Sequence, residues 1–267
     1  MAEREVVACL GSSTTAGRGQ AFDWIGELAR RPQNARFAFR NFGVGGDLAM
    51  NALARVDDVV ASRPDRVIVI IGSNDILATV FPFLRRIYRV TKGLRDRPSA
   101  ARFEADLTAI VRRLKAETHA AIALASLAEV GEAPQSSDPA QAALNRLYAE
   151  YRGIVQRVAA EESATYLPLY EAFHAALFAE SGRAFSHFNP LPFYRDTFRF
   201  FVRHWSGDEI AEANGWRFHV DGIHLNRRGA TILMDVVQAF LDRPLSTLGA
   251  ADQDAGDEHE QAADHDL

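Results

Sequence analysis

The sequence is poor in cysteine and has no long apolar run. A single cysteine, Cys9, stands among 267 residues, so an internal disulfide is excluded. Cys9 lies in the apolar run 6–10 and is predicted to be a buried strand residue rather than a reactive thiol. No apolar stretch reaches the roughly 18 residues that suggest a membrane span. The first residues also lack a basic segment followed by an apolar one, so no secretory signal is predicted and the expected compartment is the cytoplasm.

Most of the chain also lacks a strong net charge of one sign. The formal net charge is −5, but residues 250–267 hold seven acidic residues and no Lys or Arg, so the remainder carries +2. A nearly neutral body gives no indication of nucleic-acid binding. We expect one domain over residues 1–248 and a disordered, solubilising acidic tail over 249–267. A tail that binds a partner is the alternative.

Short apolar runs alternate with longer amphipathic ones. Strands are predicted over five ranges, which are 6–10, 36–42, 66–71, 121–127 and 164–167. Helices are predicted over the segments between and after them, which are 21–31, 47–61, 100–117, 139–162 and 226–241. Asn226 is a suitable N-cap for the last helix. The alternation predicts an α/β domain with a parallel sheet and helices on both faces, whose functional side chains follow the carboxyl ends of the strands.

Two stretches interrupt this alternation and are interpreted as insertions. Residues 77–98 hold six basic residues and one acidic residue, with aromatic side chains between them. A solvated helix face is the simpler interpretation, and weak contact of an amphipathic helix with a membrane surface is the alternative. Residues 170–219 are dense in aromatic residues. These side chains either pack a small core of the insertion's own or form an acyl pocket or its lid.

The loop after the first strand places hydroxyl groups at the end of the sheet. It reads Gly11-Ser12-Ser13-Thr14-Thr15-Ala16-Gly17, and Gly11 allows a sharp turn there. A phosphate-binding P-loop does not fit, because Arg18-Gly19 follows where Lys and Ser or Thr are required. The nucleophile elbow of α/β-hydrolases lacks its second glycine. By itself the loop is also consistent with an ordinary polar turn.

The loops after the second and third strands offer groups that bind an anion. Three glycines in the segment 43–46 allow a close approach of the backbone, and Gly46 is expected at the start of a helix, where N–H groups favour negative charge. A tight strand-to-helix turn explains the same glycines without any ligand. Asn74, at the end of the third strand, offers a neutral amide donor of the kind that stabilises an oxyanion. Asp75 is interpreted as a helix cap or a support for Asn74.

A turn near the C-terminus contains Asp221 and His224. A spacing of three can bring the carboxylate to one ring nitrogen and leave the other free as a base. The remaining histidines of the aromatic stretch lack metal-ligand spacing and are interpreted as surface or packing residues: His174, His187, His204 and His219.

Together the four loops supply every group that acyl transfer requires. Ser13 would be the nucleophile, His224 its base and Asp221 the residue that orients the base. This chemistry requires neither a metal nor a cofactor.

The four loops, in this order, resemble those of the SGNH/GDSL hydrolases. The resemblance covers residues 5 to about 240 apart from the two insertions, and its motifs are Leu10–Gly17, Asn41-x-Gly43-x-x-Gly46, Gly72-x-Asn74-Asp75 and Asp221-x-x-His224. It implies a flavodoxin-like three-layer α/β/α fold with a central parallel five-stranded sheet. It also implies an oxyanion hole formed by the N–H groups of Ser13 and Gly46 and by the Asn74 side chain. The implied activity is hydrolysis of a carboxylic ester or thioester, of a small molecule or a lipid, through an acyl-enzyme.

One position departs from the family pattern. The residue before the nucleophile is usually Asp in the family, and here it is Ser12. The hydrogen bonds of that Asp must be replaced or lost, which bears on the rigidity of the loop. Two alternatives to hydrolysis stay open: an acyltransferase that uses the same triad, and a binding protein without catalysis. The acyl group, the alcohol group and the oligomeric state are not determined by these motifs.

Overall fold

The computed structural model describes residues 3–17, 21–188 and 190–249, with only the backbone described for 190–194 and 249. All five predicted strands are present: β1 (Glu5–Gly11), β2 (Phe37–Gly43), β3 (Arg66–Ile70), β4 (Ala121–Ala125) and β5 (Thr165–Leu167). The α-helices in the first half of the chain are α1 (Ser13–Ala16), α2 (Trp24–Ala29), α3 (Ala49–Leu53), α4 (Val56–Ala61), α5 (Ser73–Val80), α6 (Pro82–Thr91) and α7 (Ala100–Glu117). Those that follow are α8 (Pro139–Glu161), α9 (Leu169–Ala179), α10 (Pro190–Phe201), α11 (Gly207–Asn214), α12 (Arg227–Leu241) and α13 (Leu245–Gly249).

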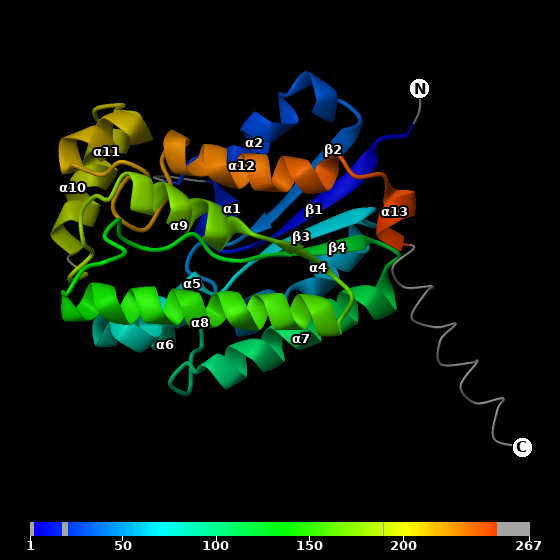
Figure 1. Cartoon of the computed structure of the whole chain (residues 1–267), viewed down its shortest axis with the longest axis horizontal. Coiled ribbons are helices and arrows are strands. Elements are labelled where there is room, and N and C mark those ends of the chain that lie inside the picture. The colour runs from blue at the N-terminus through cyan, green and yellow to red at the C-terminus, as the bar shows by residue number, and fades with distance from the viewer. Residues whose placement is uncertain (1–2, 18–20, 189, 250–267) are drawn as a thin grey trace, which may run out of the picture.

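The five strands form one parallel sheet in the order β2-β1-β3-β4-β5. This is the flavodoxin-like order, in which β1 and β3 flank the point where the connections change direction. Helices α2 and α12 cover one face of the sheet, and α4, α7 and α8 cover the other (Figure 1). The predicted three-layer α/β/α fold with a five-stranded parallel sheet is therefore confirmed.

The central strand explains why the sheet needs helices on both faces. Every residue of β3 is buried, as expected for a strand covered on two sides. Cys9 of β1 is also fully buried, as predicted, and burial raises the pKa of its thiol well above the usual value. At the amino end of β3, the buried Arg66 donates hydrogen bonds to the Phe240 and Arg243 carbonyls. This guanidinium fastens the end of α12 to the sheet.

Some predicted boundaries differ from the structure. The single helix expected over 47–61 is two helices, α3 and α4, separated at Arg55. The Arg55 side chain reaches back to the Asp47 carboxylate and to the Phe42 carbonyl, so tertiary hydrogen bonds outweigh the helical pattern at this point. The expectation for the last helix was correct, since the Asn226 side chain accepts a hydrogen bond from the Gly229 N–H at 3.0 Å.

The two interrupting stretches form helices near the carboxyl ends of the strands. In the segment 77–98, α6 buries Leu84 and Tyr88 and exposes Phe83 and Val90. Helices α10 and α11 of the second stretch lie together at the end of the molecule where α1 follows β1 (Figure 1). The buried aromatic residues of this stretch belong to the main hydrophobic core, not to a small core of their own: Phe173, Phe185, Trp216 and Phe218.

None of the helices in the described part of the chain combines the length and the apolar character that crossing a bilayer requires. The suggested contact of residues 77–98 with a membrane surface stays a prediction. The acidic tail lies outside the described residues, apart from the backbone of Gly249.

Candidate active site

Ser13 is the first residue of α1, and only Ser12 separates it from the carboxyl end of β1. The chain can turn so tightly because Gly11 has no side chain. A Cβ at this position would overlap the Thr15 side chain and the Ile70 carbonyl of the neighbouring strand. The turn brings the Ser13 side chain, which is half-buried, to the end of the sheet as predicted.

Two side chains hold the short helix that begins at Ser13. The Trp24 indole Nε1–H donates to the Thr14 carbonyl at 2.9 Å. The Asn41 amide donates to the Thr15 carbonyl at 2.9 Å and accepts from the Gly43 N–H at 2.8 Å. These bonds satisfy carbonyls at the end of a helix of only one turn. The loop is therefore braced from β2 and α2, although Ser12 stands where the family usually has Asp.

The glycine turn after β2 lies beside Asn74. Gly46 has a φ of 78°, a left-handed conformation that favours glycine, and a Cβ there would lie 3.0 Å from the Lys92 side chain. The helix expected to begin at Gly46 begins later, at Ala49, because residues 44–47 form a turn of their own. The Asn74 Nδ2 donates to the Asp47 carbonyl at 2.8 Å, which joins α5 to this turn. Asp75 caps α3 by accepting from the Ala49 N–H at 3.1 Å.

Asp221 and His224 form a hydrogen-bonded pair within one turn. The His224 Nδ1 lies 2.8 Å from the Asp221 Oδ2. The other carboxylate oxygen, Oδ1, accepts from the backbone N–H groups of Ile223 at 2.9 Å and of His224 at 2.8 Å. These contacts fix the ring so that Nε2 is the nitrogen that can take up a proton.

The electrostatics of the pair suit a base. Burial alone would raise the pKa of Asp221, but the attraction and hydrogen bond of His224, with the two backbone donors, hold that pKa at about 2. Burial disfavours the imidazolium, yet the Asp221 carboxylate outweighs it and raises the pKa of His224 above its usual 6.5. Asp221 is therefore ionised at neutral pH and favours proton uptake by His224.

A buried carboxylate that the sequence reasoning missed supports this turn. Glu132, in the loop after β4, is fully buried. Its carboxylate accepts from the backbone N–H groups of Arg217, Phe218 and His219 at 2.7–3.1 Å, and it contacts the His219 Nδ1 at 3.0 Å. Burial works against the charge, but these donors lower the pKa of Glu132. The residues from 217 to 219 lead directly into the Asp221–His224 turn, so Glu132 anchors the strand-like segment before it.

No local signal in the sequence marks Glu132. It lies 85–87 residues from the N–H groups that it accepts from, and a single Glu in a loop is ordinary. His219, interpreted as a surface or packing residue, proves to be a fully buried partner of this carboxylate.

A small cavity brings the separate loops together. It has a volume of about 20 Å³ and is lined by Ser13 and Asn74 together with Ile223 and Leu225, the residues on either side of His224. Its other walls combine the apolar Ile70, Leu127, Ala128 and Leu169 with the hydroxyl-bearing Ser12, Thr14 and Ser73. The sequence-predicted serine, asparagine and Asp–His turn therefore meet at the carboxyl edge of the sheet.

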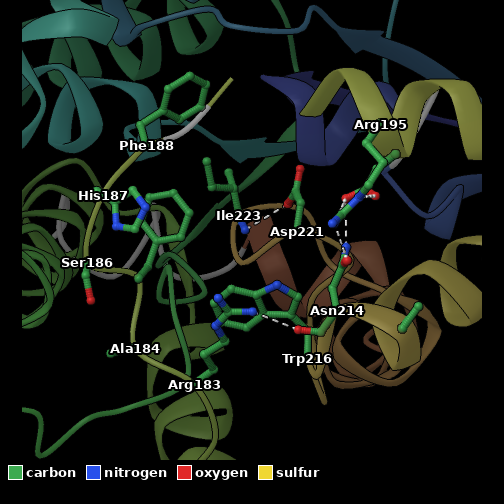
Figure 2. Close-up of a pocket in the computed structure, with 13 residues that line it drawn as sticks. Arg183, Ala184, Ser186, His187, Phe188, Arg195, Asn214, Trp216, Asp221 and Ile223 are labelled. Atoms are coloured by element: carbon green, nitrogen blue, oxygen red, sulfur yellow. Dashed lines mark hydrogen bonds and ion pairs between the residues drawn. The ribbon is translucent and has the colours of Figure 1, made fainter. Parts of the chain in front are cut away.

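A larger pocket of about 380 Å³ adjoins this cavity and shares Ile223 with it. Figure 2 shows Arg195 and Asn214 on one side of the pocket and His187 and Phe188 on the other, with Asp221 and Ile223 between them. The Arg183 guanidinium lies 5.5 Å from the centre of the Trp216 ring and donates to the Asn214 carbonyl at 3.0 Å. The pocket therefore combines an aromatic wall with many hydrogen-bonding groups. Several of its residues come from the aromatic stretch 170–219.

Within the described ranges, no group of three or more His, Cys, Asp or Glu side chains is arranged to hold a metal ion. Two histidines of the segment 170–219 contact a glutamate, and His174 is the more exposed of them. It lies 2.9 Å from the buried Glu129 carboxylate and stacks on Tyr170. His174 and His219 are therefore packing residues with defined partners, as interpreted from the sequence.

Comparisons with known proteins agree with this fold. A search of the curated proteins found no match. Axe2, an acetylxylan esterase from Geobacillus stearothermophilus, is similar in structure with a TM-score of 0.60 at 19% identity, over 92% of this chain and 98% of that one. The acetyl xylan esterase AlAXEase gives a TM-score of 0.58 at 17% identity, over 88% and 98% of the two chains. Variants of Axe2 that replace a serine, a histidine or an aspartate are described as catalytic mutants.

The likeness to these structures shows the fold, and a family model shows the family. The model of the GDSL-like lipase/acylhydrolase family matches residues 9–192, which is more than half of the chain. That range contains the serine, glycine and asparagine loops described above. The chain belongs to the GDSL-like lipase/acylhydrolase family and is a hydrolase of ester bonds.

Proposed function

We propose that this protein is a serine esterase that removes small acyl groups from a polar alcohol through an acyl-enzyme. Ser13 is the nucleophile, His224 the general base and Asp221 the residue that orients it. The N–H groups of Ser13 and Gly46 and the Asn74 side chain bind the oxyanion. The observation that supports this most is the cavity in which Ser13 and Asn74 meet the turn of the Asp221–His224 pair.

The reaction takes two steps. The His224 Nε2 accepts the Ser13 proton as Oγ attacks the ester carbonyl, and the carbonyl oxygen becomes a tetrahedral oxyanion held by the three donors. The protonated His224 gives its proton to the departing alcohol, which leaves an acyl-serine. A water molecule then loses a proton to His224 and attacks the acyl group. Collapse of the second tetrahedral species releases the acid and returns the proton to Ser13.

The size of the cavity favours a small acyl group. A volume of about 20 Å³ has room for about one water-sized group. Its lining includes the aliphatic side chains of Ile70, Leu127 and Leu169, which suit a small apolar group. An acetyl methyl group fits this description, whereas a fatty acyl chain requires movement of these side chains.

The adjoining pocket favours a polar alcohol of sugar size. Aromatic and hydrogen-bonding side chains suit a ring with several hydroxyl groups, and Phe188, Ser186 and His187, none of them buried, provide such a lining. Acetylated saccharides are consistent with this pocket and are the substrates named for the similar structures.

The first test is replacement of the nucleophile. Ser13→Ala should reduce hydrolysis of p-nitrophenyl acetate to background, because the acyl-enzyme cannot form without Oγ. A fluorophosphonate probe should label the unaltered protein at Ser13 and leave the variant unlabelled, with unchanged circular dichroism as the control for folding. Turnover that persists in the folded variant, or labelling elsewhere, would refute the assignment.

The second test addresses the substrate. Across p-nitrophenyl acetate, butyrate and octanoate, kcat/KM should decrease as the chain lengthens, because the acyl cavity holds about one small group. Acetylated xylo-oligosaccharides tested beside acetylated glycerol separate a sugar-binding pocket from an unselective one. Highest activity on the octanoyl ester would overturn the acyl-size argument and leave the serine mechanism untouched.

A further inference from the structure

Helix α6 lies against the groups that would bind the oxyanion, although its sequence suggested a solvated helix face or a membrane-surface helix. Tyr88 is buried in α6, and its hydroxyl lies 2.7 Å from the Asn74 Oδ1. One turn further along the chain, Lys92 packs beside Gly46. The helix therefore reaches both the side-chain donor and a backbone donor of the proposed oxyanion hole.

The hydrogen bonds around Asn74 determine which way its amide faces. The Asp47 backbone carbonyl can only accept, so the group that lies 2.8 Å from it must be the Asn74 Nδ2. The Asn74 Oδ1 then faces Tyr88, and the phenol must donate. An Asn amide carries two N–H hydrogens on Nδ2, and Asp47 takes one of them. The second is the hydrogen that an oxyanion in the adjoining cavity can use.

The acceptor of the first hydrogen is itself held in place. The Asp47 carboxylate is buried and accepts from Arg55 at 2.7 Å and from the Lys92 Nζ at 2.8 Å. The Asn51 amide adds a hydrogen bond to the Lys92 carbonyl at 2.9 Å. The Asn74 side chain is thus hydrogen-bonded through its oxygen to Tyr88 and through its nitrogen to the turn at Asp47, which Lys92 stabilises.

We infer that Tyr88 is a positioning residue for the oxyanion hole, which aims the free N–H of Asn74 at the substrate oxyanion. This inference rests on the proposed function, because it assigns Asn74 a role in the transition state. Without the phenol, no other residue in the described part of the chain donates to the Asn74 Oδ1 at this buried position, and the amide can rotate or recruit water. The segment 77–98 is then part of the catalytic architecture.

The environment of Tyr88 keeps its hydroxyl a donor. Burial, and next the charge of Asp75, raise the pKa of Tyr88 above its usual value. Burial likewise raises the pKa of Asp75 to about 7 despite the hydrogen bond from Ala49. The phenol therefore stays protonated at every pH at which a histidine base works.

A double-mutant cycle on p-nitrophenyl acetate tests the inference. Tyr88→Phe keeps the ring and removes only the hydroxyl, and it should lower kcat about tenfold with KM unchanged, the effect of one lost hydrogen bond. Asn74→Ala should lower kcat about 10²–10³-fold. In the double variant, kcat should match that of Asn74→Ala within about twofold, because Tyr88 acts through Asn74.

The outcomes separate the two proposals. An unchanged kcat in Asn74→Ala would refute the oxyanion role of Asn74 and with it the proposed function. A full loss in Asn74→Ala with no loss in Tyr88→Phe would overturn the inference about Tyr88 alone. A further tenfold loss from Tyr88→Phe in the Asn74→Ala background would also overturn it, because the phenol would then act independently of Asn74.

Tyr166→Phe is the matched control. This tyrosine lies on β5, two strands from β3 in the sheet, and its hydroxyl donates to Glu171 at 2.9 Å. The variant also loses one hydrogen-bonded phenol hydroxyl, so it should retain kcat and KM. A tenfold loss of kcat in this control would show that loss of any such hydroxyl lowers activity, and would overturn the assignment to Tyr88.

Discussion

A buried carboxylate stabilises each of the two halves of the candidate site, and the two carboxylates differ in how far along the sequence their partners lie. On the oxyanion side, Asp47 follows Gly46 directly and is paired with the cations of Arg55 and Lys92. On the base side, Glu132 accepts from backbone N–H groups 85–87 residues away and from a buried histidine. Asp47 therefore secures its own turn, whereas Glu132 secures a turn made by a remote part of the chain.

This difference between the oxyanion side and the base side follows from the topology of the parallel sheet. Ser13, Gly46 and Asn74 come after β1, β2 and β3, and parallel pairing of these strands brings their ends together without further help. The Asp221–His224 turn does not follow a strand of the sheet. An antiparallel bridge between His219 and Leu225 closes the turn, and Glu132 holds it at the same edge. The base side therefore depends more on individual long-range bonds than the oxyanion side does.

The largest effect is expected on the base side, from Asp221→Asn. An amide cannot hold His224 in the required tautomer or stabilise its charge, so kcat should decrease about 10⁴-fold. The oxyanion donors are untouched, so residual hydrolysis above background should remain. Steady-state kinetics with p-nitrophenyl acetate measure this loss.

The pH profile of the same variant checks the cause. In the unaltered protein, kcat/KM should rise with pH as His224 loses its proton, with a midpoint above 6.5 because Asp221 raises the pKa of His224. Without the carboxylate, only burial acts on the imidazole, and the midpoint should move to lower pH. A midpoint that stays in place would show that Asp221 does not govern His224.

A smaller effect, on stability, should distinguish the two carboxylates. Glu132→Gln replaces the acceptor of several buried N–H groups by an amide that also presents donors, and should lower the free energy of unfolding by about 3 kcal/mol. Asp47→Asn should cost about 1.5 kcal/mol, since Arg55 and Lys92 are partly exposed and can turn to water.

Urea unfolding of both variants, followed by circular dichroism, provides the measurement. If the free energy of unfolding decreased in Asp47→Asn as much as in Glu132→Gln, or more, the comparison would be contradicted. The local carboxylate would then contribute at least as much stability as the remote one. Equal slopes of the two unfolding transitions serve as the check that both variants unfold in the same manner.

The fold was largely predictable because its signals are local. The β-branched run 66–71 and the amphipathic pattern of 100–117 predicted β3 and α7 within a residue or so. The prediction of one continuous helix over 47–61 was wrong, because Arg55 makes tertiary hydrogen bonds that the periodicity of the sequence does not reveal. The aromatic residues of 170–219 were expected in a small core of their own or at an acyl pocket, but the buried ones join the main core.

The sequence by itself determined the parallel α/β sheet, the family and the candidate residues Ser13, Gly46, Asn74, Asp221 and His224. The propensities for strands, helices and turns act over short spans, so their residue patterns can be recognised in the sequence alone. Only the tertiary structure decided what holds these groups in place. Tyr88 and Glu132 gain their roles from hydrogen bonds to residues 14 and 85–87 positions away. A buried polar group is recognised by the partner that satisfies it, and that partner is known only once the chain has folded.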